Sequence, residues 1–159
     1  MTTLAPSARP APAPTPLERI EALSDAGSYR PWRSAVEDGV FSGQVRIFGR
    51  PAMVWAQDGS RRGGALGAAA GETIARTIER AEHGRMPVVG FAASGGARIQ
   101  EGVAALSAYA AIFRAQSLAS VPQVTVVSGV CAGGAAYATA LGDLTITAGE
   151  ESRLFLTGS

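Results

Sequence analysis

Two glycine pairs, each placed after a buried apolar run, constrain the fold of this chain most. Met86–Ala92 is one such run, and Ser94-Gly95-Gly96 follows it closely. Gln123–Val127 is a second run of this kind, and Cys131-Ala132-Gly133-Gly134 comes shortly after it. Apolar runs of this length are typical of strands that are covered on both faces. Each run is therefore predicted to be a buried strand whose end turns through glycine into a helix.

The other segments have the spacing of helices and further strands. Glu72–His83 carries Ile74 and Ile78 four residues apart and is closed by Gly84. Alternation of strands and helices predicts an α/β domain with parallel strand pairing. The remaining predicted elements are a short helix from Pro16 to near Gly27, a hairpin of Val40–Ile47 and Ala52–Ala56, a long helix over Arg98–Leu118 with Val103, Leu106, Ala110 and Phe113 on one face, a small-residue helix over Ala135–Leu141, and short strands at Leu144–Thr147 and Leu154–Leu156.

Composition excludes several kinds of chemistry. All 14 basic residues are arginine, so a lysine Schiff base, a Walker A lysine and a lysine-attached biotin are excluded. Cys131 is the single cysteine and His83 the single histidine, which excludes an intrachain disulfide, a cysteine-based zinc ribbon and a histidine-rich metal site. We expect no metal in this chain. Its chemistry must therefore depend on backbone groups, carboxylates, hydroxyls, one thiol or a partner chain.

Charge and hydropathy limit the partners and the location. The formal net charge is only +1, so no basic excess is available to neutralise nucleic-acid phosphates. No apolar run approaches the roughly 20 residues that span a bilayer, and the first residues lack the apolar core of a secretory signal. We expect a cytoplasmic protein. Residues 1–16, rich in Ala and Pro, are predicted to form a disordered arm, and residues 17–159 the folded domain.

The glycine turns suggest a chemical role for the main chain. Glycine adopts backbone angles that other residues resist and lets another molecule approach the main chain closely. Two N–H groups aimed at one oxygen form an oxyanion hole, and each well-placed donor contributes about 2.7–4 kcal/mol to the transition state. A thioester that loses an α-proton becomes an enolate with its charge on such an oxygen. The turns alone are also compatible with a purely structural role in chain reversal and packing.

Motifs in a fixed order extend over residues 36–159. They are Gly39-Val40 through Gly49-Arg50, Ala56-Gln57-Asp58, Gly63-Gly64-Ala65-Leu66-Gly67, Pro87-Val88-Val89-Gly90, Ser94-Gly95-Gly96-Ala97-Arg98-Ile99-Gln100-Glu101-Gly102, Cys131-Ala132-Gly133-Gly134-Ala135 and Phe155-Leu156-Thr157-Gly158. This ordered set resembles the acyl-CoA carboxyltransferases, the β subunits of propionyl-CoA and acetyl-CoA carboxylases in the crotonase superfamily. An ordered set is far more specific than any one of its motifs.

The resemblance implies a crotonase-like ββα spiral in which this chain is the N-terminal half of a carboxyltransferase domain. It implies a site where an acyl-CoA thioester meets carboxybiotin, with the biotin carried on a separate protein. In such enzymes backbone N–H groups stabilise the thioester enolate, and decarboxylated biotin is thought to take the α-proton. Carried over by position, Gly95, Gly96 and Ala97 are the oxyanion candidates. The residues expected to bind substrate are Arg61, Arg62, Gly63, Gly64, Arg98, Cys131, Gly133 and Gly134, with Gly133 and Gly134 as second-line oxyanion candidates. The residues themselves leave other roles open: a solvated loop for Arg61 and Arg62, a structural salt bridge or solvated position for Arg98, and a small buried residue for Cys131.

The sequence also departs from the family pattern. Ala93 stands before Ser-Gly-Gly where many members have Asp, and Ser159 stands where proline is usual. A family N-terminal half continues beyond this point, and a homologous C-terminal half completes the site. We therefore expect a domain truncated at its C-terminal end, as a fragment, a processed piece or a short subunit. Its partners would be a C-terminal-half protein or segment and a biotin carrier protein, in a hetero-oligomer.

Other interpretations remain open from the residues. Ser94 and Cys131 each lie in a sequence close to a nucleophile elbow, although His83 precedes both. Glu101 would serve as a general base only if its pKa were raised by burial, and otherwise is a helix-start acid. Two other functions compete with carboxyl transfer: a biotin-independent decarboxylase of malonyl-type thioesters, and a non-catalytic assembly subunit that has kept the fold.

Overall fold

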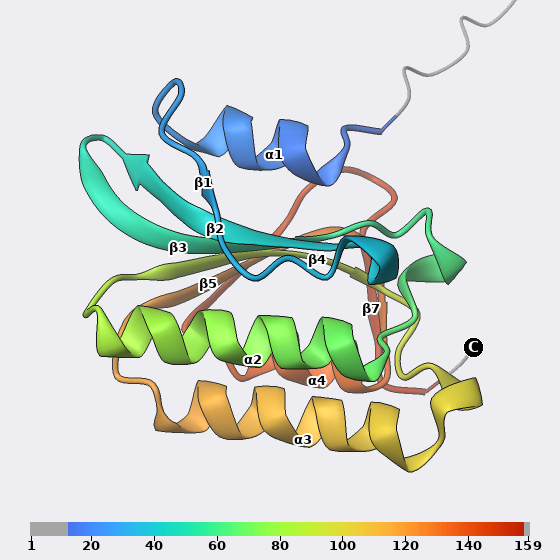
Figure 1. Ribbon diagram of the computed structural model, residues 1–159. Helices are drawn as coiled ribbons and strands as arrows, with labels where there is room; N and C mark the ends of the chain where they lie inside the picture. The colour runs from blue at the N-terminus through green and yellow to red at the C-terminus, as the bar shows by residue number, and fades with distance from the viewer. Residues whose placement is uncertain (1–12, 158–159) are drawn as a thin grey trace, which may run out of the picture.

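A mixed sheet with helices on both faces forms the described part of the chain, residues 13–157 of the computed structural model (Figure 1). The strand order is β1-β2-β3-β4-β5-β6, and β7 pairs with β5. The pairs β1–β2 and β2–β3 are antiparallel, whereas β3 to β6 and the β5–β7 pair are parallel. The predicted α/β class with parallel pairing is confirmed. The elements are α1 (Pro16–Leu23), β1 (Arg30–Pro31), η1 (Val36–Asp38), β2 (Val40–Ile47), β3 (Arg50–Gln57), η2 (Arg62–Gly64), α2 (Ala68–His83), β4 (Val88–Ser94), η3 (Ile99–Glu101), α3 (Val103–Leu118), β5 (Gln123–Ala132), α4 (Gly134–Ala140), β6 (Leu144–Thr147) and β7 (Arg153–Phe155).

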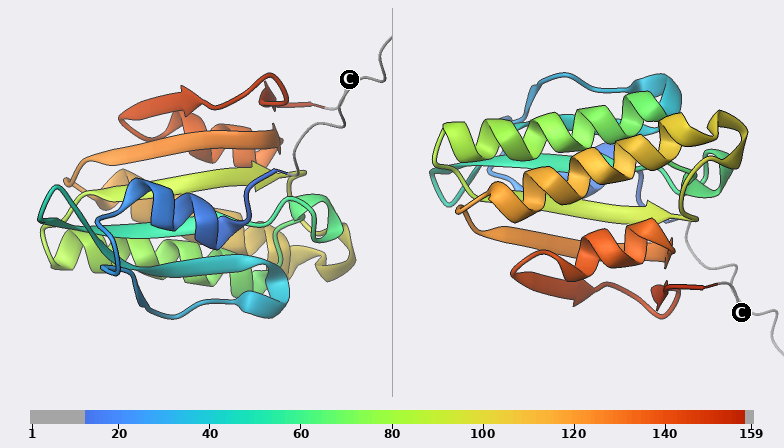
Figure 2. Two further views of the ribbon diagram at one scale, coloured as in Figure 1. Left: turned by 90° about the horizontal axis from the view of Figure 1, so that it is seen from above. Right: turned by 90° about the horizontal axis from the view of Figure 1, so that it is seen from below.

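Helices cover the two faces of the sheet unequally. α1 lies on one face, while α2, α3 and α4 lie on the other (Figures 1 and 2). Ile20 of α1 is fully buried in a small core with Val54 and Phe91. A larger core joins the opposite face of the sheet to α2 and α3 and includes Ile78 and Ile112. Every residue of β4 is buried, as expected for a central strand that is covered on both faces.

Local sequence signals explain the first helix and the hairpin. Thr15 caps α1: its hydroxyl accepts from the Glu18 N–H, and the Glu18 carboxylate accepts from the Thr15 N–H. α1 begins at Pro16, so the folded part includes the last residue of the predicted arm. Residues 13–15 of that arm are also described, with Thr15 as the helix cap, and residues 1–12 lie outside the described residues. In the predicted hairpin, Phe48 and Gly49 both have positive φ, as a two-residue turn between twisted strands requires.

The long helix differs from the prediction. Gly102 has a φ of +53° and separates the short turn η3 from α3, which begins only at Val103. Val103 and Leu106, which are on the predicted apolar face, are 77% and 62% exposed. The buried face instead contains Tyr109 and Ile112. α3 packs on α2 through small residues: a Cβ on Gly71 of α2 would collide with Ala108. This close contact between the helices decides which face of α3 is buried.

Several strand and helix limits also differ from the expected ones. β4 begins at Val88 and reaches Ser94, β5 continues to Ala132, and α2 begins at Ala68, four residues earlier than predicted. Small and polar residues at the ends of these elements weaken the apolar pattern, and the register between β4 and β5 shifts between Ala92 and Ser94. Within residues 13–157, none of the helices combines the length and the apolar character that crossing a bilayer demands.

Candidate functional site

Three glycine-containing segments follow parallel strands at one edge of the sheet. Loop 58–67 follows β3, turn 95–98 follows β4, and Gly133 follows β5. The carboxyl ends of neighbouring parallel strands lie at one edge, where α/β folds place their ligands. A hollow of about 550 Å³ lies there between the first two segments, and we call it the loop hollow. Its lining residues are Arg62, Gly63, Ala65, Gly95, Ala97, Arg98, Ile99 and Gln100.

The loop after β3 and the turn after β4 are joined by their main chains. The Gly95 N–H donates to the Gly63 carbonyl at 2.9 Å. The Leu66 N–H donates to the Gly96 carbonyl at 2.8 Å, and the Arg98 N–H donates to the Leu66 carbonyl at 2.9 Å. These bonds form because the main chain of the loop after β3 lies directly against that of the turn after β4.

Gly64 shows how close this approach is. Its φ is +69°, and a Cβ placed there would collide with the Ala93 carbonyl and lie 2.8 Å from the Ser94 Cα. A side chain at this position would therefore push the two segments apart. The glycine predicted to bind substrate thus has a demonstrable packing role, and it does not line the loop hollow.

The three predicted oxyanion donors are not equivalent. The prediction that the Gly95 N–H is an oxyanion donor is wrong, because this N–H is already bonded to the Gly63 carbonyl. The Gly96 N–H reaches only the Ser94 Oγ, at 3.2 Å. The Ala97 N–H makes no hydrogen bond within residues 13–157, and Ala97 lines the loop hollow. Gly96 and Ala97 therefore remain as candidate donors.

These two amides do not stand at a helix start. The turn after β4 runs into η3, and α3 begins only at Val103. The predicted strand–glycine–helix unit is therefore wrong for this turn, and the dipole of α3 does not act on Gly96 or Ala97. The second turn does have the predicted form, because α4 begins at Gly134 directly after Gly133.

The second turn adjoins the first but does not line the loop hollow. The Gly133 N–H donates to the Phe155 carbonyl at 3.0 Å, so this amide is not available to a substrate. The first turn of α4, which begins at Gly134, has no side-chain cap. A Cβ on Gly134 would lie 2.9 Å from the Tyr109 ring, and one on Gly96 would lie 3.2 Å from the Ala132 carbonyl oxygen. The second turn therefore packs against the first.

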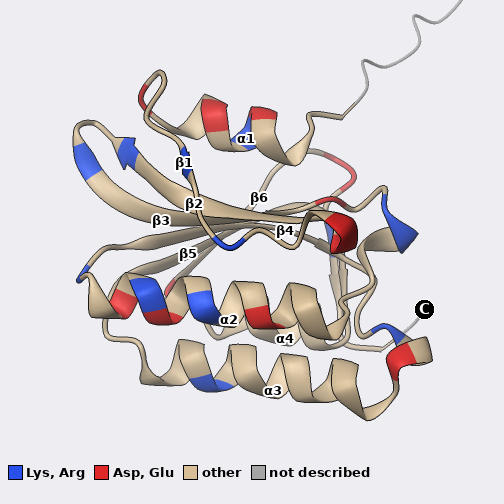
Figure 3. Cartoon of the chain, in the orientation of Figure 1, with Lys and Arg blue, Asp and Glu red and all other residues tan. Residues whose placement is uncertain are grey.

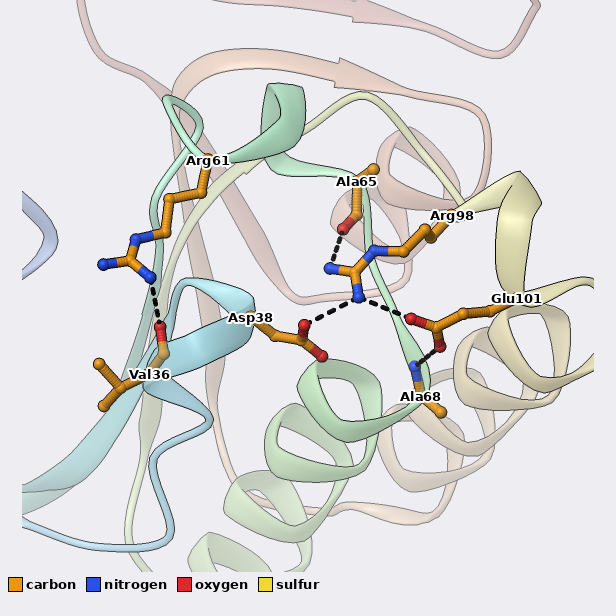
Figure 4. A network of polar contacts seen from close by, with 7 residues as sticks. All are labelled: Val36, Asp38, Arg61, Ala65, Ala68, Arg98 and Glu101. Carbon is orange, nitrogen blue, oxygen red and sulfur yellow. Dashed lines mark hydrogen bonds and ion pairs between the residues drawn. The ribbon is translucent and has the colours of Figure 1, made fainter.

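The three arginines expected to bind substrate have different surroundings. Arg62 is exposed, lines the loop hollow and forms no ion pair within the described part of the chain. Arg61 is turned away from it: its Nη1 donates to the Val36 carbonyl at 3.1 Å, and its Nε lies 3.5 Å from Asp58 Oδ2 (Figure 4). Of these two, only Arg62 is placed to meet an anion in the hollow.

Arg98 is buried and both of its Nη atoms are hydrogen-bonded within the protein, so it takes the structural salt-bridge role and the prediction that it binds substrate is wrong. Its Nη1 donates to Asp38 Oδ1 at 2.8 Å and to Glu101 Oε1 at 2.6 Å, and its Nη2 donates to the Ala65 carbonyl at 3.1 Å (Figure 4). Burial by itself disfavours the charged guanidinium, but the hydrogen bonds to both carboxylates outweigh it and raise the pKa of Arg98. Sequence reasoning missed Asp38, which is 60 positions from Arg98 and belongs to no motif signal.

Glu101 is neither a general base nor a cap for its own helix. Its Oε2 accepts from the N–H of Ala68, the first residue of α2, at 2.8 Å. This hydrogen bond, together with the bond from Arg98, lowers the pKa of Glu101 below its ordinary value. A general base would need the opposite shift. Glu101 therefore caps α2, whose N-cap residue Gly67 has no side chain to do so.

Neither nucleophile candidate has the surroundings of an activated nucleophile. Ser94 is 1% exposed, and its Oγ lies 3.3 Å from the Tyr109 hydroxyl. Cys131 is fully buried beside Ser94 on the neighbouring strand, and burial raises the pKa of its thiol. His83 ends α2 near the start of β4, whereas Ser94 ends that strand, so the length of β4 separates them. Both the elbow interpretation and the placement of Cys131 in the substrate site are therefore wrong.

Within residues 13–157, no three His, Cys, Asp or Glu side chains gather as a metal site would need. The loop hollow offers the N–H of Ala97, unbonded in the described part of the chain, and the exposed guanidinium of Arg62.

Known proteins resemble this chain over nearly its whole length. The family model described as "Carboxyl transferase domain" matches residues 9–159. The propionyl-CoA carboxylase beta chain of Saccharopolyspora erythraea is 39% identical over 165 residues, which cover 91% of this chain and 30% of that protein. The mitochondrial propionyl-CoA carboxylase beta chain of Homo sapiens is 39% identical over 163 residues, with the same coverage. The chain thus spans about 30% of the length of these relatives.

Solved structures show the same fold. Transcarboxylase 12S, solved with hydrolysed methylmalonyl-coenzyme A bound, superposes with a TM-score of 0.87 at 34% identity, covering 92% of this chain and 32% of that one. The Pseudomonas malonate decarboxylase MdcD-MdcE hetero-dimer superposes with a TM-score of 0.80 at 32% identity, covering 91% of this chain and 65% of that one. The crotonase-like fold expected from the resemblance is confirmed by these superpositions.

Proposed function

The chain belongs to the carboxyl transferase domain family, and on that premise we propose that it forms part of a site that moves a carboxyl group between carboxybiotin and an acyl-CoA thioester. The observation that carries this proposal is the unbonded amide of Ala97 at the loop hollow, next to the weakly bonded amide of Gly96, which is buried and is not among the lining residues. Ala97 lines the hollow with its N–H unbonded in the described residues, and the neighbouring Gly96 N–H has only the long bond to Ser94. A carbonyl oxygen in the hollow would find donors that need not give up a strong bond.

The chemistry assigned to these donors is the stabilisation of an enolate. When the thioester loses its α-proton, the electron pair of the C–H bond moves toward the carbonyl oxygen, which becomes negatively charged. The N–H groups of Gly96 and Ala97 would hold that oxygen while the α-proton passes to decarboxylated biotin. The α-carbon would then bond to the carboxyl carbon that carboxybiotin gives up when its N–C bond breaks. Each fixed donor of this kind contributes about 2.7–4 kcal/mol in the transition state. No side-chain nucleophile is needed, which agrees with the inert surroundings of Ser94 and Cys131.

The coenzyme A portion would lie along the outer rim of the hollow. Arg62 is exposed there and forms no ion pair with a described residue, so its guanidinium is available to a phosphate. Gly63 precedes Gly64 on the same loop and has open space where a Cβ would stand. Its main chain is therefore accessible to a bound ligand.

Uncovered apolar surface supports the proposed partners. α3 carries a single charged residue, Arg114, and exposes Val103 and Leu106 (Figure 3). Leu154 of β7 and the nearby Leu156, which line a hollow with Tyr137 of α4, are 43% and 65% exposed. Surfaces of this kind usually contact protein. We propose that a carboxyltransferase C-terminal-half protein or segment completes the site, in a hetero-oligomer, and that biotin arrives on a separate carrier protein.

A second candidate function has its own support. The chain covers 65% of a chain in the malonate decarboxylase hetero-dimer, about twice the share that it covers of transcarboxylase 12S. The same two donors would stabilise the enolate that forms when a malonyl-type thioester loses carbon dioxide. In that case no biotin is required, and the enolate takes up a proton at its α-carbon instead of a carboxyl group.

A transfer assay on the assembled protein, with its C-terminal partner, separates these functions. A malonyl-type CoA thioester is supplied with and without free biotin, and both carbon dioxide and carboxylated biotin are measured. Carboxylated biotin, formed only when biotin is present, supports carboxyl transfer. Release of carbon dioxide at the same rate without biotin supports the decarboxylase. Complex formation with no turnover of any thioester, in the wild type and in Gly96→Val, would identify a non-catalytic assembly subunit.

A further inference from the structure

The buried guanidinium of Arg98 connects segments that are far apart in the sequence. Asp38 comes from η1, Ala65 from the loop after β3, and Glu101 from η3 (Figure 4). Through the second oxygen of Glu101 the connection continues to Ala68 at the start of α2. We call these five residues the Arg98 cluster.

The cluster lies directly behind the loop hollow. Ala65 and Arg98 both line the hollow, and the Arg98 guanidinium bonds to the Ala65 carbonyl. The main chain of Arg98 also donates to Leu66, whose own N–H donates to the Gly96 carbonyl. Side chain and main chain of one residue therefore hold the loop after β3 against the turn that carries Gly96 and Ala97.

The space around Arg98 is shaped for this side chain. A Cβ on Gly67 would overlap Arg98 Nη1 and lie 2.6 Å from Glu101 Oε1. Arg98 is 7% exposed, and its Nε finds no acceptor in the described residues, so the two Nη atoms carry all of the side chain's polar contacts. A planar fork reaches two carboxylates and a carbonyl at once, whereas the single ammonium of lysine cannot reproduce that geometry.

We propose that Arg98 is a positioning residue: it fixes the loop after β3 against the turn after β4 and thereby sets the direction of the Gly96 and Ala97 N–H groups. The effect of Arg98 on the reaction rests on the proposed function. The contact that Arg98 maintains between the two segments, which we call the clamp, is a property of the fold alone. The Nη atoms of Arg98 are committed to Asp38, Glu101 and Ala65, so the proposed role does not depend on contact with the substrate. The loss of Arg98 acts through the two amides.

Replacement of Arg98 in the assembled enzyme tests the proposal. Because a displacement of about 1 Å at a catalytic group is able to cost 100-fold in rate, Arg98→Met is expected to lower kcat by about 100-fold. KM for the acyl-CoA should change by less than about threefold, since the groups that bind its remote parts are unchanged. Arg98→Lys should recover only part of the loss. Arg76→Met is the matched control, because Arg76 also pairs with two carboxylates, Glu72 and Glu79, but on the exposed surface of α2.

Hydrogen exchange separates failure of the clamp from failure of the proposed function. In Arg98→Met, the amides of Leu66, Ala68 and Arg98 should exchange faster than in the wild type, and in Arg76→Met they should not. If the wild-type complex transfers or releases no carboxyl group from any thioester, the proposed function fails, and exchange alone decides the clamp. Arg98→Met with wild-type kcat and wild-type protection at these amides would overturn the proposal.

A second variant covers the case in which Arg98→Met does not fold because two carboxylates are left unpaired. Asp38→Asn, Arg98→Met and Glu101→Gln combined remove the three charges together. This variant is expected to retain the fold, to lose about 100-fold in kcat and to exchange rapidly at Leu66. Full activity together with slow exchange at Leu66 in the triple variant would show that the cluster positions nothing.

Discussion

Replacement of Gly64 by alanine tests the close contact between the loop after β3 and the turn after β4. The φ of Gly64 is +69°, a conformation that costs an L-residue about 1–2 kcal/mol. The new methyl group would also collide with the Ala93 carbonyl and lie 2.8 Å from the Ser94 Cα. Since both are backbone atoms, they cannot rotate away, and overpacking of this kind costs about 1–3 kcal/mol more.

Gly27→Ala is a closely matched control. Gly27 has the same φ of +69° but has no atom within 4 Å of the position where a Cβ would stand. This variant therefore carries the conformational cost without the collision. The difference between the two variants isolates the contact between the segments, and Gly64→Ala is expected to be less stable than Gly27→Ala by about 1–3 kcal/mol.

Urea unfolding and the transfer assay measure the two consequences. Relief of the collision requires the segments to separate, which displaces the amides at the loop hollow, so kcat of Gly64→Ala should fall about 100-fold. Gly27→Ala should retain the wild-type kcat. If Gly64→Ala matched Gly27→Ala in both its free energy of unfolding and its kcat, the close approach of the two segments would play no part in the site.

Three further changes test other parts of the structure. Gly96→Val should abolish turnover while leaving the secondary structure measured by circular dichroism intact, because its side chain would crowd the candidate donors; wild-type rates would remove Gly96 from the mechanism. Ile112→Ala should cost about 2–5 kcal/mol in urea unfolding and Leu106→Ala within about 0.5, and equal losses would contradict the observed face of α3. Burial raises the pKa of Tyr109 to about 12, so the contribution of Tyr109 to stability is full below pH 10 and is lost as the pH rises toward 12. In Tyr109→Phe, the free energy of unfolding, measured in urea at each pH, should therefore fall less between pH 10 and 12 than in the wild type.

Much of the fold was predictable because it depends on local patterns. Gly84 ends α2 as its position after an amphipathic segment suggests, and the predicted hairpin turns at Phe48 and Gly49. These signals arise within a few residues, so the sequence displays them directly. The face of α3 was not predictable in this way, because Val103 and Leu106 point outward while small residues such as Ala108 face α2. The close contact between α2 and α3 there favours small side chains over large ones.

The candidate site was only partly predictable. The motif residues Gly63, Gly95 and Ala97 do meet at one hollow, as their positions after parallel strands indicate. The order of the motifs could not show that the Gly95 amide is bonded while the Ala97 amide is not. It also suggested a ligand role for Arg98, which the structure shows in a buried ion-pair cluster.

The amino-acid sequence by itself determined the positions of the strands, the places where glycine lets the chain turn, and the absence of lysine chemistry. Only the tertiary structure decided which amides of the glycine turns remain free and which partners the buried Arg98 takes. The physical reason is that a hydrogen bond depends on distance and direction between groups whose separation along the chain is large, such as Asp38 and Arg98, and no local pattern encodes that geometry.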